Sequence, residues 1–71
     1  MKMNIIFAKH AEEQMKERGI SKDEVINTIK YPEKTIKSSD RYYARKKVSM
    51  GIIEVVYIRE KYIKVITVYP L

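Results

Sequence analysis

One segment carries the pattern of a helix, a helix end and a new helix start: His10-Ala11-Glu12-Glu13-Gln14-Met15-Lys16-Glu17-Arg18-Gly19-Ile20-Ser21. Apolar residues recur along it at helical spacing, and with the preceding alanine they are Ala8, Ala11 and Met15. This spacing predicts a helix over residues 8–18. Gly19 is suited to the left-handed conformation that ends a helix. Ser21 and Glu24 then form an S-x-x-E capping box, which predicts that a second helix begins at once.

The second helix carries its own apolar stripe, and its end is also marked. Val25, Ile26 and Ile29 lie at helical spacing after the capping box. Pro32 disfavours helical geometry at the residue before it, so we expect the helix to end near Lys30-Tyr31. The two helices therefore form a tight hairpin.

Outside the hairpin the sequence favours strands. Residues 4–7 read as a short strand, and after Pro32 the pattern changes to the two-residue period of strands. The expected strands are Lys34–Ser38, Arg41–Val48, Ile52–Arg59 and Tyr62–Tyr69. We predict an α+β domain over residues 1–71: an N-terminal strand, the helical hairpin, then an antiparallel β-meander with both helices on one face.

Composition narrows the class of protein. The 71 residues include no cysteine, so disulfides and thiolate zinc sites are excluded. The first seven residues are too short and interrupted for the apolar segment of a signal peptide, and no apolar run is long enough to span a membrane. We expect a cytoplasmic protein without a membrane partner. Few Gly, Pro, Asn and Gln beside many Lys, Glu, Ile and Tyr are typical of a thermophilic source.

Positive charge is concentrated in the second half of the chain. Of the net charge of +6, residues 33–71 contribute nine Lys/Arg against four Asp/Glu. Alternation along Arg41–Val48 puts four side chains on one side of the strand: Arg41, Tyr43, Arg45 and Lys47. Such a surface suits RNA, because cations neutralise phosphates while a base stacks on the ring. Lys64 on the last strand is a further candidate contact, and a merely solvated outer face is the alternative.

One row of the first helix carries the other candidate groups. His10, Gln14 and Arg18 are spaced i, i+4, i+8 and share one side of the helix. The imidazole suits acid–base chemistry, although a lone surface histidine is as common. Arg18 suits either a phosphate or the carbonyls at the end of its own helix. We expect no metal site and no cofactor, because ligand clusters and glycine-rich phosphate loops are absent from the sequence.

The order of elements and the block His10-Ala11, Met15 and Arg18-Gly19-Ile20-Ser21 resemble a small RelE-like family with the pattern H-A-x-x-R-M-x-x-R-G-I-S. That family is part of the RelE/ParE superfamily of toxin–antitoxin proteins, and the resemblance covers nearly the whole chain. It implies a two-layer RelE-like fold in a single domain. One departure is that Gln14 stands where the family usually has arginine.

The resemblance also implies an activity and partners. RelE-type members are metal-independent endoribonucleases that act on mRNA, free or on the ribosome, and an antitoxin protein neutralises them. With this resemblance, the candidate catalytic residues are His10, Arg18, Arg45 and Tyr69, and the candidate RNA-binding residues are Arg41, Tyr43, Lys47 and Lys64. Two alternatives stay open: a non-catalytic module that binds nucleic acid or protein, and a ParE-like gyrase inhibitor. The edge strand Lys34–Ser38 also allows a homodimer.

Overall fold

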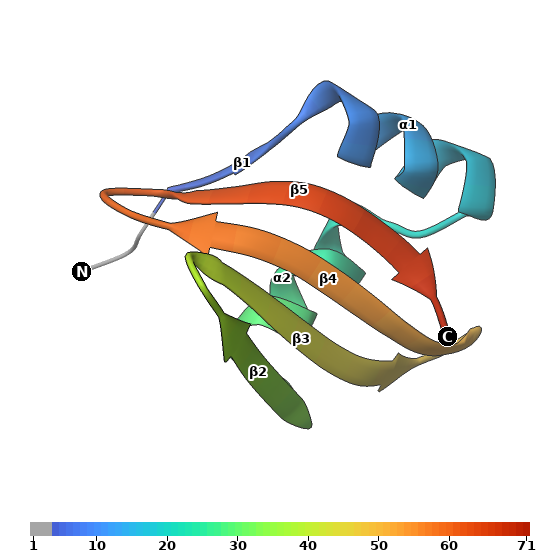
Figure 1. Ribbon diagram of the computed structural model, residues 1–71. Helices are drawn as coiled ribbons and strands as arrows, with labels where there is room; N and C mark the ends of the chain where they lie inside the picture. The colour runs from blue at the N-terminus through green and yellow to red at the C-terminus, as the bar shows by residue number, and fades with distance from the viewer. Residues whose placement is uncertain (1–3) are drawn as a thin grey trace.

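The computed structural model describes residues 4–71. Residues 1–3, which open the segment judged too short for a signal peptide, lie outside the described residues. Five strands and two helices follow in the order β1 (Ile5–Phe7), α1 (Lys9–Arg18), α2 (Lys22–Lys30), β2 (Lys34–Ser38), β3 (Arg41–Val48), β4 (Gly51–Arg59) and β5 (Ile63–Pro70) (Figure 1). The predicted α+β order of elements is confirmed.

The strands form one mixed sheet with the order β1-β5-β4-β3-β2. β2 to β5 are the predicted antiparallel meander. β1 returns to the far edge and pairs parallel with β5, where Ile5 lies opposite Ile63 and Phe7 opposite Val65. The N-terminal strand thus closes one edge of the sheet, while β2 forms the other.

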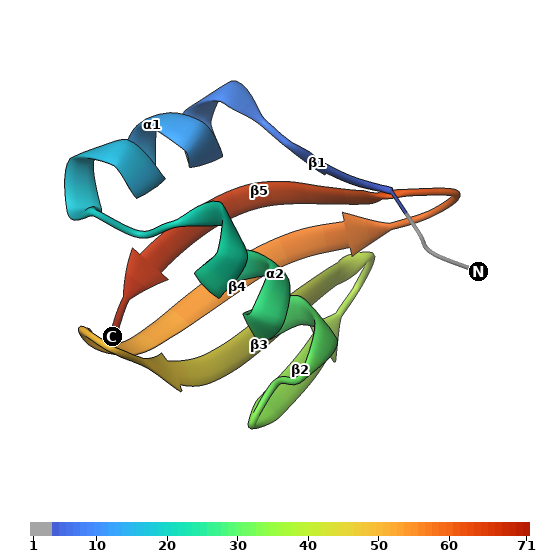
Figure 2. The same cartoon turned by 180° about the vertical axis from the view of Figure 1, so that it is seen from behind.

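Both helices pack on the same face of the sheet, as predicted. α2 crosses behind β3 and β4 in Figure 1 and in front of them in Figure 2, whereas α1 runs beside β5. The core lies between these layers, and burial of its apolar side chains is the main force that holds them together. Its buried residues are Ala11, Met15, Ile20, Val25, Ile29, Ala44, Ile53, Val55, Tyr57, Ile63, Val65 and Val68. We call the opposite surface of the sheet, which neither helix covers, the open face.

The residues predicted to end α1 and to begin α2 do so in the structure. Gly19 has a φ of 68° and its N–H donates to the Met15 carbonyl, which ends α1. The Ser21 side chain accepts from the Glu24 N–H, and the Glu24 carboxylate accepts from the Ser21 N–H, which completes the capping box of α2. Over residues 4–71, neither helix is long and apolar enough to cross a membrane.

β2 and β3 have the predicted bounds, whereas β1, β4 and β5 differ from their predicted bounds by one residue at one or both ends. β5 begins at Ile63 because Tyr62 belongs to the preceding turn, in which the Glu60 N–H donates to the Tyr62 carbonyl at 2.9 Å. β4 begins at Gly51, which pairs with Val48 across a tight hairpin.

Candidate functional site

The register of the sheet places polar side chains in rows across the open face. Residues directly opposite each other on neighbouring strands point to the same face. Lys34 lies opposite Arg45, Arg45 opposite Glu54, and Glu54 opposite Tyr69. One row therefore crosses β2, β3, β4 and β5 and brings two cations, a carboxylate and a phenol together.

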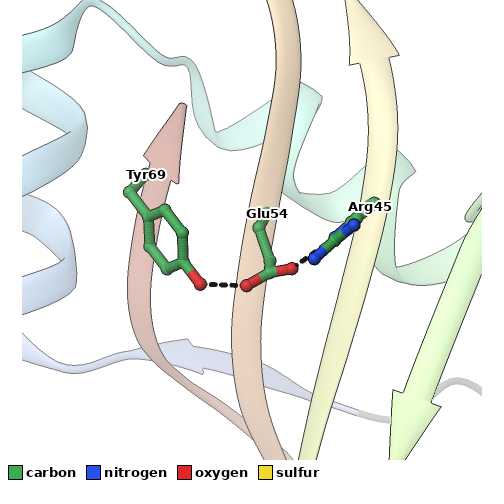
Figure 3. Close-up of polar contacts among 3 residues, drawn as sticks. All are labelled: Arg45, Glu54 and Tyr69. Carbon is green, nitrogen blue, oxygen red and sulfur yellow. Dashed lines mark hydrogen bonds and ion pairs between the residues drawn. The ribbon is translucent and has the colours of Figure 1, made fainter. Parts of the chain in front are cut away.

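Three members of this row are in direct contact (Figure 3). The Arg45 Nε donates to Glu54 Oε2 at 2.5 Å, and the Tyr69 hydroxyl donates to Glu54 Oε1. Glu54 is only 4% exposed, so its carboxylate is almost removed from water. A buried carboxylate is costly unless it is paired and hydrogen-bonded, and here both oxygens are occupied.

The contacts set the protonation states of the cluster. Burial opposes ionisation of Glu54, but the hydrogen bonds from Tyr69 and Arg45 and the charge of Arg45 together lower its pKa below 4.5. The hydrogen bond to Glu54, with burial and the negative charge beside it, raises the pKa of Tyr69 above 10.0. At neutral pH the cluster therefore holds an ionised Glu54 carboxylate and a Tyr69 phenol that keeps its proton.

Arg45 has donors left for a ligand. Its side chain is 40% exposed, and among residues 4–71 it bonds to Glu54 through Nε alone. The two terminal amino groups of a guanidinium form a planar fork that matches two oxygens of a phosphate. Glu54 thus orients Arg45, and the free edge of the guanidinium is the part available to an anion.

Further cations surround the cluster on the same face. Arg41 lies opposite Ile58, which lies opposite Lys64, and Lys47 lies opposite Ile52. Tyr43 stands between Arg41 and Arg45 on β3. In the paired positions of β2 to β5 the open face has one carboxylate, and its cations are Lys34, Arg41, Arg45, Lys47 and Lys64. The predicted basic, tyrosine-bearing side of β3 thus lies on the uncovered surface, and Lys64 shares it.

The predicted row of α1 meets the sheet at a different place. Arg18 donates to the Val68 carbonyl at 2.9 Å, and the Gln14 side-chain oxygen accepts from the Val68 N–H at 3.1 Å. The Arg18 guanidinium therefore binds β5 rather than the carbonyls of its own helix. His10 is exposed in the first turn of α1. Two strands, β4 and β5, separate this row from Arg45, so the structure does not bring His10 and Arg18 together with the cations of β3.

Two tyrosines belong to the other side of the sheet. Tyr57 is 6% exposed and stacks on Tyr42, with 5.2 Å between ring centroids. Lys37 lies over the Tyr42 ring at 5.4 Å. Tyr57, which shares a face with Arg59 on β4, therefore stabilises the helix-facing layer.

Sequence reasoning missed Glu54 and Lys34. Both join the site only through cross-strand register, which a single strand does not reveal. A signal for Glu54 was nevertheless present, because it is the one charged residue within Gly51–Ile58. A lone carboxylate in an apolar strand needs a cationic or hydrogen-bonding partner on a neighbouring strand.

The protein is thus a two-layer α+β domain whose uncovered sheet face is cationic around a carboxylate that is bound by arginine and tyrosine. The chain belongs to the family described as Domain of unknown function (DUF4258), whose model matches residues 7–70. That match includes both helices and the whole meander. No curated protein and no solved structure matches the chain.

Proposed function

We propose that this protein is a RelE-like toxin: a metal-independent endoribonuclease that binds single-stranded RNA, such as mRNA, on the open face and cleaves it at the Arg45–Glu54–Tyr69 cluster. The observation that supports this most is the cluster itself, at the centre of an uncovered cationic surface. The resemblance to RelE-like chains points to the same chemistry. An antitoxin protein that covers the open face and carries complementary negative charge is part of the proposal.

RNA binding follows from the spacing of groups along β3. Alternate residues on one side of a strand are about 6.7 Å apart. Arg41, Tyr43, Arg45 and Lys47 therefore present a cation, a ring and two more cations along one line. A single strand laid along β3 would place phosphates against the cations while a base stacks on Tyr43.

The cleavage step uses the three residues of the cluster in distinct roles. The 2′-oxygen attacks the neighbouring phosphorus and gives its proton to the Glu54 carboxylate. The terminal amino groups of Arg45 hold the phosphate oxygens on which negative charge develops. The bond from phosphorus to the 5′-oxygen breaks, and the Tyr69 hydroxyl gives that oxygen a proton. The products carry a 2′,3′-cyclic phosphate and a 5′-hydroxyl.

The contact between Tyr69 and Glu54 then allows both groups to return to their starting protonation states. After cleavage Glu54 holds a proton and Tyr69 has lost one. A direct transfer along their hydrogen bond returns both groups to their starting states. No second proton donor is needed, so His10 is not required as a catalyst in this scheme.

The pKa shifts predict the pH dependence of cleavage. The rate falls when Glu54 becomes protonated, which occurs below about pH 4.5 because its pKa is lowered. It stays flat through neutral pH, because the raised pKa of Tyr69 keeps the phenol protonated. Catalysis by a histidine, by contrast, ordinarily gives the pH–rate profile an inflection at about pH 6.5, the pKa of an unperturbed imidazole.

The test is cleavage of an end-labelled single-stranded RNA with excess chelator, with and without ribosomes. Wild type should give cyclic-phosphate products, and Glu54→Gln, Arg45→Met and Tyr69→Phe should each lower the rate at least tenfold. Arg59→Met is the matched control, because Arg59 lies on β4 in register with Ile63 on the helix-facing side.

Two outcomes would overturn the proposal. One is equal cleavage by wild type and the three cluster variants. The other is RNA binding without cleavage in any of these conditions, which would favour a non-catalytic binding module of the same fold.

A further inference from the structure

The outer edge of β5 is hydrogen-bonded by different partners along its length. β1 pairs only with Ile63, Lys64 and Val65, and the Ala8 N–H donates to the Val65 carbonyl at 2.9 Å, where this pairing ends. β5 continues to Pro70. A strand edge without a neighbour exposes backbone N–H and C=O groups that need other partners.

Two side chains of α1 take the place of the missing strand. The Gln14 side-chain oxygen accepts from the Val68 N–H at 3.1 Å and also from the Thr67 hydroxyl. The Arg18 guanidinium donates to the Val68 carbonyl at 2.9 Å. Both backbone groups of Val68 are therefore bound by side chains one turn apart on the same side of α1.

These hydrogen bonds lie close to an irregularity in the pairing of β4 with β5. The register between β4 and β5 shifts between Val56 and Tyr57, which pair with Thr67 and Val65 and leave Ile66 unmatched. A bulge interrupts the ladder of hydrogen bonds locally. Tyr69 lies three residues beyond Ile66, and its hydroxyl must still reach Glu54 on β4.

We infer that Gln14 and Arg18 are positioning residues for Tyr69: by binding Val68 and Thr67 they fix the end of β5 so that the Tyr69 hydroxyl meets Glu54. The consequence for cleavage rests on the proposed function, whereas the positioning of Tyr69 does not. Neither residue touches the reacting atoms in this scheme. The i, i+4, i+8 row of α1 thus acts on the site through β5.

The test separates positioning from general stability. Gln14→Met keeps the length of the side chain and removes the acceptor, while Gln14→Glu keeps an acceptor for both donors. Glu17→Met, on an exposed position of the same helix, is the matched control. Arg18→Met is the second test variant should Gln14→Met fail to fold. Circular dichroism confirms that each variant is folded at the temperature used.

The first readout needs no catalysis. Carbon-13-labelled tyrosine rings are titrated by NMR, with Tyr69→Phe used to assign the Tyr69 signal. Gln14→Met and Arg18→Met should lower the apparent pKa of Tyr69 towards its ordinary value of 10.0, because the contact with Glu54 weakens. Gln14→Glu and Glu17→Met should not lower it. An unchanged Tyr69 titration in a folded Gln14→Met or Arg18→Met variant would overturn the inference.

The second readout is RNA cleavage. Gln14→Met should lower kcat about tenfold with KM nearly unchanged, which corresponds to about 1.4 kcal/mol of transition-state stabilisation. A rise in KM alone would contradict a positioning role. If wild type cleaves no RNA but the Tyr69 titration shifts as described, the inference stands and the proposed function fails.

Discussion

Replacing Glu54 with glutamine tests how the buried cluster contributes to stability. Glutamine keeps the shape of the side chain, can accept from Arg45 and can donate to the Tyr69 oxygen, but it carries no charge. Hydrogen bonds to charged groups contribute roughly 1.5–3 kcal/mol, against roughly 1 kcal/mol for neutral ones. Because the Arg45 side chain is 40% exposed, water screens part of this difference. We therefore expect Glu54→Gln to lower the free energy of unfolding by about 1–1.5 kcal/mol at pH 7.

The sign of the pH dependence follows from the lowered pKa of Glu54. A carboxyl whose pKa is lower in the folded protein stabilises the fold above its unfolded pKa, and this contribution is lost as the pH falls through the folded pKa. With a reference pKa of 4.5, the difference in free energy of unfolding between wild type and Glu54→Gln should have its full size above about pH 5 and should shrink in more acid solution.

The assay is unfolding followed by circular dichroism at pH 7 and at pH 2. At pH 7 the melting temperature of Glu54→Gln should be lower by about 5–10 °C, since 1 kcal/mol shifts a domain of this size by roughly 4–8 °C. Glu13→Gln, an exposed position on α1, is the control and should change stability by less than about 0.5 kcal/mol. Equal melting temperatures at pH 7, or a difference of the same size at pH 2, would show that the Glu54 carboxylate does not stabilise the fold.

Three further predictions concern the hairpin and the open face. Gly19→Ala should destabilise the fold by about 1–2 kcal/mol, measured by urea unfolding, because its φ of 68° is unfavourable for alanine. Beyond the two chain neighbours nothing lies within 4 Å of the added methyl, so the backbone conformation alone causes the loss, and an unchanged midpoint would contradict this. Ser21→Ala should cost about 1 kcal/mol in the same assay through loss of the N-cap, whereas Ser38→Ala should cost less. Lys47→Met should make the negative slope of log affinity for single-stranded RNA against log salt shallower by about 0.7, because one phosphate contact is lost. Lys37→Met, on the helix-facing side, should leave the slope unchanged. A Lys47→Met slope equal to that of wild type would show that Lys47 does not contact RNA.

Features encoded within a few neighbouring residues could be predicted from the sequence. Gly19 and the Ser21–Glu24 capping box set the hairpin through hydrogen bonds between residues four and three positions apart, so their pattern is visible in a short stretch of sequence. The face of Arg41, Tyr43, Arg45 and Lys47 follows from the two-residue period of a strand. Burial of Ala11 and Met15 likewise follows from helical spacing.

The site itself depends on register between distant segments, which a single sequence does not specify. Glu54 meets Arg45 and Tyr69 only because β3, β4 and β5 pair in this alignment. Gln14 and Arg18 find their partners on β5 at separations of 53 and 50 residues. Helical spacing therefore predicts that Gln14 and Arg18 share one side of α1, whereas their partner, the edge of β5, is specified only by the tertiary structure.

Binding of RNA on the open face, with a phosphate at Arg45, can be followed by NMR titration. The ligand is a single-stranded RNA with 2′-O-methyl groups, which binds but has no 2′-hydroxyl to attack the phosphate. We predict that the Arg45 Nε–H signal and the signals of its open-face neighbours Tyr43 and Lys47 shift together and saturate, while those of α2 stay in place. Shifts confined to α2 and the helix-facing side, or an Arg45 Nε–H signal unmoved at saturation, would rule out RNA binding at Arg45 on the open face.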